Sequence, residues 1–281
     1  MIISGRAKIA GVMGWPISHS LSPRMHCFWI EQHDIDGTYV PLLVPPDGLA
    51  QALQALPLMG FCGVNVTIPH KVGALSVCHI VDEQAERVGA INTVIVDEDG
   101  RLHGSNTDVF GFLENLRQNS EWRADNGPVV LVGAGGAARA IAVALLEAGA
   151  KEIRIVNRTK SRAIELAEKF GDTILPIPWE ERVNSLEGAS LLINATNLGM
   201  QGQVPLDLPL DRLSAEAIVN DIVYSPLETN LLKAARARGN HVVDGLGMLL
   251  HQAQPGFEAW YGVRPKVTKK LRKFVLEPPR G

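Results

Sequence analysis

The stretch VVLVGAGGAARA, residues 129–140, constrains the fold of this chain more than any other part of its sequence. Four apolar residues typical of a buried strand run into a glycine turn, and an alanine-rich segment typical of a helix follows. Gly133, Gly135 and Ala138 match the G-x-G-x-x-A pattern of a dinucleotide-binding β-α-β unit. There the first glycine permits a tight turn, the second admits a pyrophosphate, and the small third residue allows close packing. An ordinary glycine turn without a ligand is the alternative.

The end of the next strand predicts which dinucleotide binds. An acidic residue about 20 positions further on would bind the ribose 2′-hydroxyl of NAD. Here the strand EIRIV is followed by Asn157, Arg158, Thr159 and Lys160, with no carboxylate. A guanidinium can bind a 2′-phosphate through charge-assisted hydrogen bonds and stack on adenine. The sequence therefore predicts NADP over NAD, unless Arg158 merely begins a solvated helix.

The first part of the chain alternates between strand and helix patterns, which predicts an α/β domain. Strands are expected at 8–14, 37–44 and 61–67, with helices at 23–33 and 47–56. Residues 90–96 and 101–106, separated by the turn DEDG, predict a local antiparallel pair.

A second α/β pattern follows a helix predicted at 108–119, where we expect the main domain boundary. Further strands are expected at 190–196, 217–223 and 241–245, and helices at 161–170, 228–239, 246–262 and 266–274. A chain of 281 residues exceeds what one hydrophobic core usually holds, so two domains with a cleft between them are predicted. The two last helices are expected to pack back on the first domain.

Composition excludes several classes of function. With 46% hydrophobic and 20% charged residues and a net charge of −3, the chain is typical of a soluble globular protein, and nucleic-acid binding is not expected. The basic stretch KVTKKLRKF is interpreted as the solvated face of a helix. Cys27, Cys62 and Cys78 have no metal-ligand spacing, so we expect reduced thiols and no metal. Without a signal sequence or an apolar run of about 18 residues, a cytoplasmic location away from membranes is expected.

Polar residues at predicted strand and helix ends suggest a second site. Ser20 and Ser22 flank a leucine in HSLSPRMH, where Ser22 is a helix N-cap, part of a carboxylate site, or both at once. Lys71, after the proline of NVTIPHK, is expected in the first turn of a helix, where the dipole disfavours a cation. If Lys71 meets Asp108, the ion pair orients an amine that can transfer a proton. The alternative is that each belongs to an ordinary surface ion pair.

Nine motifs in order cover nearly the whole chain: GWPISHSLSP, NVTIPHK, GAINT, NTD, GAGGAARA, NRT, NAT-LGM, VYSPLET and DGLGMLLHQA. In this ordered set the chain resembles the shikimate dehydrogenase family. The resemblance implies a substrate-binding domain at 1–107, with the helices 246–281 packed on it, and a Rossmann-type NADP-binding domain at 108–245. It also implies reversible NADP-dependent reduction of 3-dehydroshikimate to shikimate, a step of chorismate and aromatic amino-acid biosynthesis.

The resemblance also implies roles for individual residues. The substrate-binding residues would be Ser20, Ser22, Thr67, Lys71, Asn92, Asp108, Tyr224 and Gln252. The cofactor-binding residues would be Gly133, Ala134, Gly135, Gly136, Ala137, Asn157, Arg158, Thr159, Lys160, Thr196, Asn197, Ile222, Gly245 and Met248. Lys71 and Asp108 would be the catalytic pair, with the Lys71 ammonium protonating the developing alkoxide. The side chain of His70 is expected to point away from that pair.

Two alternatives to this function are kept. The first is an enzyme of the same class that acts on quinate, which differs from shikimate by saturation and a hydroxyl at the carboxylate-bearing carbon. The paired serines favour shikimate, and Asn157 in place of a carboxylate argues against an NAD-linked quinate enzyme. A nucleotide-sensing module without catalysis would not need Lys71 together with Asp108. The sequence leaves open whether the chain forms a homodimer.

Overall fold

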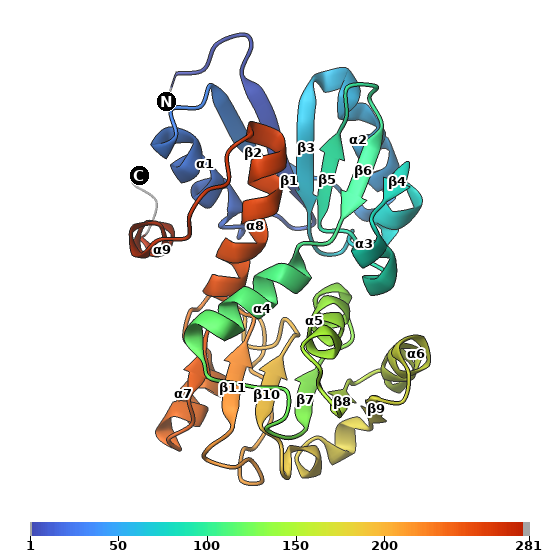
Figure 1. Cartoon of the computed structure of the whole chain (residues 1–281), viewed down its shortest axis with the longest axis vertical. Coiled ribbons are helices and arrows are strands. Elements are labelled where there is room, and N and C mark those ends of the chain that lie inside the picture. Colours follow the sequence, from blue (N-terminus) through green and yellow to red (C-terminus); the bar gives the residue numbers. More distant parts are fainter. Residues whose placement is uncertain (1, 278–281) are drawn as a thin grey trace. The chain divides into compact units, whose positions relative to one another are not determined.

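The computed structural model describes residues 2–277 and consists of two compact α/β units. Unit 1 contains the chain up to Asp108 and from Leu249 onward, and unit 2 is Val109–Met248. Each unit has its own six-stranded sheet (Figure 1). The predicted class, two α/β domains, is therefore confirmed.

The sheet of unit 1 is mixed, with the strand order β2-β1-β3-β5-β6-β4. Its strands are β1 Lys8–Gly14, β2 Gly37–Leu43, β3 Phe61–Val66, β4 Ile80–Val81, β5 Thr93–Val96 and β6 Leu102–Ser105. β1 pairs in parallel with β2 and β3, whereas β5 is antiparallel to both β3 and β6. The predicted antiparallel pair is thus present, and β4 is a short strand that the sequence did not predict.

The C-terminal helices complete the core of unit 1. Its helices are α1 Ser22–Gln32, α2 Leu49–Ala55, α3 Glu83–Val88, α8 Leu246–Tyr261, which begins in unit 2, and α9 Lys269–Leu276. The indole N–H of Trp260 donates to the Val94 carbonyl at 3.1 Å, and the Tyr261 hydroxyl donates to the Thr38 carbonyl at 2.8 Å. α8 therefore lies against this sheet, as Figure 1 shows.

Unit 2 has six parallel strands in the order β12-β11-β10-β7-β8-β9. The strands are β7 Val129–Val132, β8 Ile153–Val156, β9 Ile174–Ile177, β10 Leu191–Asn194, β11 Ile218–Asp221 and β12 Val242–Val243. The helices are α4 Asp108–Asn119, whose first residue belongs to unit 1, α5 Gly136–Glu147, α6 Lys160–Phe170 and α7 Asn230–Ala237. The chain starts at the central strand β7, adds strands on one side, and then adds strands on the other, which is the doubly wound order.

Within residues 2–277, no helix combines the length and the apolar character needed to cross a bilayer. The apolar residues are instead used in the cores, where all four residues of β7 are fully buried.

Gly63 sits where the register between β1 and β3 shifts, with a positive φ of 150°. A Cβ at this position would collide with the Val94 carbonyl oxygen and the Trp260 indole nitrogen. Those two atoms form the hydrogen bond that attaches α8 to β5. Only glycine therefore fits between the sheet and α8 at this point.

We expect Gly63→Ala to lower the free energy of unfolding by about 2–4 kcal/mol, because the clash involves backbone and φ is unfavourable for alanine. Urea denaturation measures the change. Gly5→Ala is the matched control, since a Cβ there meets no atom within 4 Å. Equal stability of the two variants would contradict this account of how α8 packs.

Candidate active site

The loop after β3 holds Lys71 through its backbone. The Thr67 N–H donates to the Met13 carbonyl at 2.9 Å, and the Lys71 carbonyl accepts from the Ile91 N–H at 2.8 Å. The His70 ring nitrogen Nε2 lies 2.8 Å from the Val44 carbonyl, and His70 is only 3% exposed. The His70 side chain therefore points away from the Lys71 amine, as expected. Its contact with the Val44 carbonyl connects this loop to the segment after β2.

Lys71 lies in a turn that precedes the 3-10 helix Gly73–Ser76. The expectation that it lies in the first turn of a helix was wrong, so the opposing dipole does not apply. Its Nζ lies 2.5 Å from Asp108 Oδ2, with side-chain exposures of 15% and 5%. Neither group is a surface charge. Asp108 begins α4, where a carboxylate is favoured by the helix dipole.

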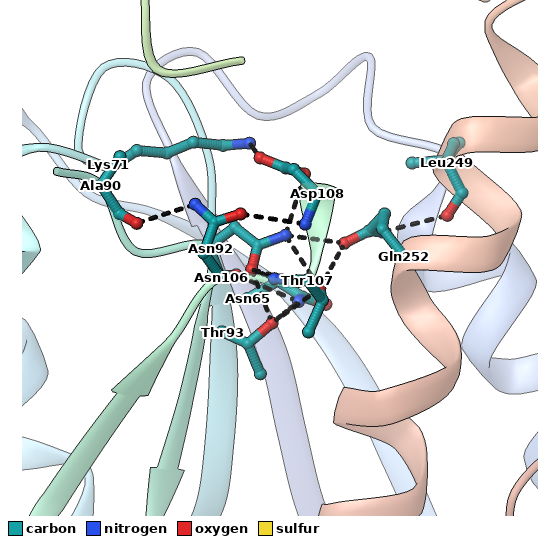
Figure 2. A network of polar contacts seen from close by, with 10 residues as sticks. All are labelled: Asn65, Lys71, Ala90, Asn92, Thr93, Asn106, Thr107, Asp108, Leu249 and Gln252. Atoms are coloured by element: carbon teal, nitrogen blue, oxygen red, sulfur yellow. Dashed lines mark hydrogen bonds and ion pairs between the residues drawn. The ribbon is translucent and has the colours of Figure 1, made fainter. Parts of the chain in front are cut away.

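Asn92 connects this ion pair to α8 (Figure 2). Its Nδ2 lies 2.9 Å from Asp108 Oδ1 and 3.1 Å from Gln252 Oε1. Its Oδ1 accepts from the Thr107 N–H at 2.8 Å. Lys71, Asn92, Asp108 and Gln252 are thus brought together inside unit 1, although Gln252 is distant from the others in the sequence.

The two predicted serines lie at the start of α1. The Ser22 N–H lies 3.3 Å from Ser20 Oγ, so the first hydroxyl accepts a hydrogen bond from the helix terminus. The helix cap is Leu21, without a side-chain bond, and Ser22 is the first helical residue. The interpretation of Ser22 as an N-cap was therefore wrong. Tyr224 follows β11 in unit 2, where burial raises its pKa.

Most of the predicted cofactor residues lie at one edge of the unit 2 sheet. β7 ends at Val132, which is paired with the last residues of its two neighbours, Val156 and Asn194. Asn194 is in turn paired with Asp221, the last residue of β11. The segments carrying Gly133–Ala137, Asn157–Lys160, Thr196–Asn197 and Ile222 directly follow these four strands. This carboxyl edge is where α/β sheets bind ligands.

The glycine turn has the geometry of a dinucleotide site. Gly133 has a φ of 118°, which lets the chain turn sharply, and a Cβ there would meet the Ala195 carbonyl at 3.0 Å. Gly135 caps α5 without a side-chain hydrogen bond, and a Cβ on it would meet no atom within 4 Å. The start of α5 is thus uncrowded at Gly135 and has no side-chain cap, as a phosphate site at a helix N-terminus requires. Ala138 is fully buried, consistent with the close packing expected of a small residue.

The segment after β8 presents cations to the same edge. Arg158 is exposed and precedes α6, which begins at Lys160, so it is not part of that helix. Asn157 Nδ2 donates to the Thr159 carbonyl at 2.8 Å and shapes the turn that carries Arg158. These residues fit a 2′-phosphate.

A buried carboxylate that the sequence did not indicate organises the other half of this edge. Asp221 is fully buried and accepts from Asn194 Nδ2 at 3.0 Å, the Val223 N–H at 3.0 Å and the Thr229 hydroxyl at 2.7 Å. Asn194 Oδ1 also accepts from the Thr196 hydroxyl at 2.7 Å. Asp221 and Asn194 therefore fix the loops after β10 and β11.

The polar interior of unit 1 also contains residues to which sequence reasoning gave no role. They are Asn65, Thr93, Asn106 and Thr107, all at most 7% exposed. The available signal was a polar residue in an otherwise apolar strand, as at Asn65 in FCGVNVT. Asn106 carried no such signal. In the structure, its Oδ1 accepts a hydrogen bond from the Asp108 N–H at 3.1 Å.

Asp221 predicts a pH dependence of stability. Burial raises its pKa from the ordinary 3.8 to about 6, so the folded state favours the protonated form. This contribution to stability is complete below the ordinary pKa and is lost as the pH rises through the raised one. Between about pH 4 and pH 7, the free energy of unfolding of the wild type should therefore fall by about 2–3 kcal/mol relative to Asp221→Asn. Denaturation at several pH values measures the difference, and a constant difference would contradict the assignment.

Comparisons with known proteins match both units. A family model described as the shikimate dehydrogenase substrate binding domain matches residues 12–94, and one described as shikimate / quinate 5-dehydrogenase matches residues 116–200. A relative named shikimate dehydrogenase (NADP(+)), from Paramagnetospirillum magneticum, is 55% identical over 98% of this chain and 100% of its own length.

Solved structures share the fold. Shikimate 5-dehydrogenase from Thermus thermophilus, in complex with NADP(H) and shikimate, superimposes with a TM-score of 0.85 at 38% identity and covers 95% of this chain and 98% of its own. Quinate dehydrogenase from Corynebacterium glutamicum, in complex with NAD, has a TM-score of 0.88 at 31% identity, with coverage of 96% and 99%.

The doubly wound sheet with its uncapped glycine turn defines a two-domain α/β protein with a Rossmann-type dinucleotide-binding unit. The identity to the relative from Paramagnetospirillum extends over both units and not only over the widespread Rossmann-type one. The chain belongs to the shikimate dehydrogenase family.

Proposed function

We propose that this protein is an NADP-dependent oxidoreductase that interconverts 3-dehydroshikimate and shikimate in the cytoplasm. This reaction is a step of the shikimate pathway to chorismate and the aromatic amino acids. The observation that carries the proposal is the buried Lys71–Asp108 pair in a chain 55% identical over its length to a shikimate dehydrogenase (NADP(+)). The Thermus thermophilus structure, in complex with NADP(H) and shikimate, supports both ligands.

We assign substrate binding to residues 1–107 with 246–281, of which 1 and 278–281 lie outside the described residues, and NADP binding to residues 108–245. Ser20 and Ser22 bind the substrate carboxylate, and Tyr224 of unit 2 is a further substrate contact. Thr67, Asn92 and Gln252 bind the ring hydroxyls and the carbonyl. Support comes from the hydrogen bonds that Asn92 makes to Asp108 and to Gln252.

The cofactor fits the carboxyl edge of the unit 2 sheet. Gly133, Ala134, Gly135, Gly136 and Ala137 bind the pyrophosphate through their backbone, and Asn157, Arg158, Thr159 and Lys160 bind the adenosine 2′-phosphate. The further cofactor contacts are Thr196, Asn197, Ile222, Gly245 and Met248. The uncapped start of α5 and the exposed Arg158 support this assignment.

The chemistry of the chain's own residues follows from their charges. Bound NADPH supplies a hydride, which leaves negative charge on the former ketone oxygen. The Lys71 ammonium stabilises that charge and donates a proton to the oxygen. Asp108 orients Lys71, and Asn92 donates a hydrogen bond to the other carboxylate oxygen, which keeps Asp108 in place. In the oxidation of shikimate, Lys71 takes the proton back.

Removing the Lys71 amine should stop turnover without removing the cofactor site. We expect Lys71→Ala to lower kcat for shikimate oxidation by at least about 100-fold, because both the proton donor and the positive charge are lost. The affinity for NADP+, measured by fluorescence titration, should stay near the wild-type value. Lys151→Ala, which removes an exposed lysine of unit 2, should be as active as the wild type. Unchanged turnover in Lys71→Ala would refute the mechanism.

Cofactor choice should depend on Arg158. We expect Arg158→Ala to raise KM for NADP+ by about 10- to 100-fold, the equivalent of a lost charge-assisted contact, and to change KM for NAD+ little. Arg212→Ala is the control, since Arg212 is exposed and pairs with Glu187 elsewhere in unit 2. Initial rates with both cofactors give the comparison, and an equal effect on the two would exclude contact with the 2′-phosphate.

The quinate dehydrogenase among the structural neighbours makes quinate the substrate to test against shikimate. Rates with shikimate and quinate, each with NADP+ and NAD+, distinguish the two enzymes. The proposal predicts the highest kcat/KM for shikimate with NADP+. A preference for quinate with NAD+ would assign the protein to the other activity, and no turnover of either would favour a binding module.

A further inference from the structure

We propose that Thr93 is a positioning residue for the reaction of Lys71 and Asp108, and that it acts by fixing the side-chain amide of Asn92. The inference rests on the proposed function, since its measurements use shikimate oxidation. Thr93 is the first residue of β5 and is 1% exposed. Its hydroxyl lies 3.0 Å from Asn92 Oδ1 (Figure 2).

The orientation of the Asn92 amide follows from a donor that cannot change its role. The Thr107 backbone N–H donates to Asn92 Oδ1 at 2.8 Å. A reversed amide would bring two donors together there, and would place an oxygen against the Asp108 carboxylate where Nδ2 now lies at 2.9 Å. Nδ2 must therefore face Asp108 Oδ1 and Gln252 Oε1 (Figure 2).

Asn65 determines the direction of the Thr93 hydroxyl. Asn65 and Thr93 are direct cross-strand partners in β3 and β5, so their side chains meet. Asn65 Nδ2 lies 3.1 Å from the Asn92 backbone carbonyl, which can only accept, and 3.2 Å from Thr93 Oγ1. Asn65 Oδ1 accepts from the Tyr39 hydroxyl at 2.6 Å. Thr93 Oγ1 therefore accepts from Asn65, which leaves its own proton for Asn92 Oδ1 at 3.0 Å or Thr107 Oγ1 at 3.3 Å, and Asn92 Oδ1 is the nearer acceptor.

The hydroxyl of Thr93 is the nearer of two threonine hydroxyls to Asn92 Oδ1, at 3.0 Å against 3.2 Å for Thr107 Oγ1, which also lies 3.0 Å from Asn92 Nδ2. Asn65, Asn92 and Thr93 are at most 5% exposed, so water does not take over a missing hydrogen bond. Without the hydroxyl, Asn92 Oδ1 loses a donor and Asn65 Nδ2 loses an acceptor. The Asn92 amide is then held less firmly, and so are its contacts to Asp108 and Gln252, on which the geometry of the reacting groups depends.

Variants of Thr93 can distinguish a positioning role of its hydroxyl from a packing role of its methyl group. Its methyl Cγ2 packs against α8 so closely that a Cβ on Gly256 would meet it at 3.3 Å. Thr93→Val keeps the shape and removes the hydroxyl, whereas Thr93→Ser keeps the hydroxyl and removes the methyl. A positioning role and a packing role therefore predict opposite orders of activity for these two variants.

The test compares shikimate oxidation by the wild type, Thr93→Val, Thr93→Ser and the control Thr38→Val, which makes the same exchange on β2. We expect Thr93→Val to lower kcat/KM for shikimate by about tenfold or more, the equivalent of one buried hydrogen bond, with KM for NADP+ unchanged. Thr93→Ser should stay within about threefold of the wild type, although the lost methyl lowers its melting temperature. Thr38→Val should be as active as the wild type.

The opposite pattern overturns the proposal. If Thr93→Val is as active as Thr38→Val, or if Thr93→Ser loses as much activity as Thr93→Val, Thr93 has only a packing role. Should Thr93→Val not fold, Thr93→Ala against Thr93→Ser gives the same comparison, because these two differ only in the hydroxyl. A wild type that does not oxidise shikimate would overturn the proposed function as well, whereas an active wild type with equal variants removes only the role of Thr93.

Discussion

Two opposite charges removed from water, the ammonium of Lys71 and the carboxylate of Asp108, impose the arrangement of the polar interior of unit 1. Buried charges are costly unless they are paired and their remaining lone pairs are satisfied. The ion pair at 2.5 Å satisfies one carboxylate oxygen, and Asn92 donates to the other at 2.9 Å. Because Asn92 is itself buried, its amide oxygen needs donors, and Thr107 and Thr93 provide them. One ion pair thus explains a whole set of buried polar residues.

Much of the fold follows from local sequence patterns. The strand at 8–14 and the helix at 108–119 were predicted with the bounds that β1 and α4 have. β4 could not be predicted in this way, because two residues contain no periodicity. β9 contains Pro176, which argues against a strand, and it is tolerated because β9 lies at the edge of the sheet. In both cases hydrogen bonds to a neighbouring strand stabilise a strand that its own sequence does not predict.

Sequence reasoning raised the pairing of Lys71 with Asp108, and the structure shows that ion pair at 2.5 Å. The signal was a lysine shortly after a proline at a strand end, whereas an aspartate at a helix start such as Asp108 is common. Thr93 carries none, because threonine is common in strands and its role depends on the register that sets it opposite Asn65. The position of Gln252 depends on how α8 packs against the unit 1 sheet, which no short stretch of sequence encodes.

Two buried carboxylates show what separates a reactive group from a structural one in this chain. Asp108 lies shortly after β6 and Asp221 is the last residue of β11, and each accepts a hydrogen bond from an asparagine side-chain amide, Asn92 and Asn194 respectively. Asp108 also binds the ammonium of Lys71, a group that can give a proton and recover it. Asp221 accepts from neutral donors, and its burial raises its pKa to about 6. The asparagine contact therefore holds a carboxylate in place, and the neighbouring lysine makes that position useful for proton transfer.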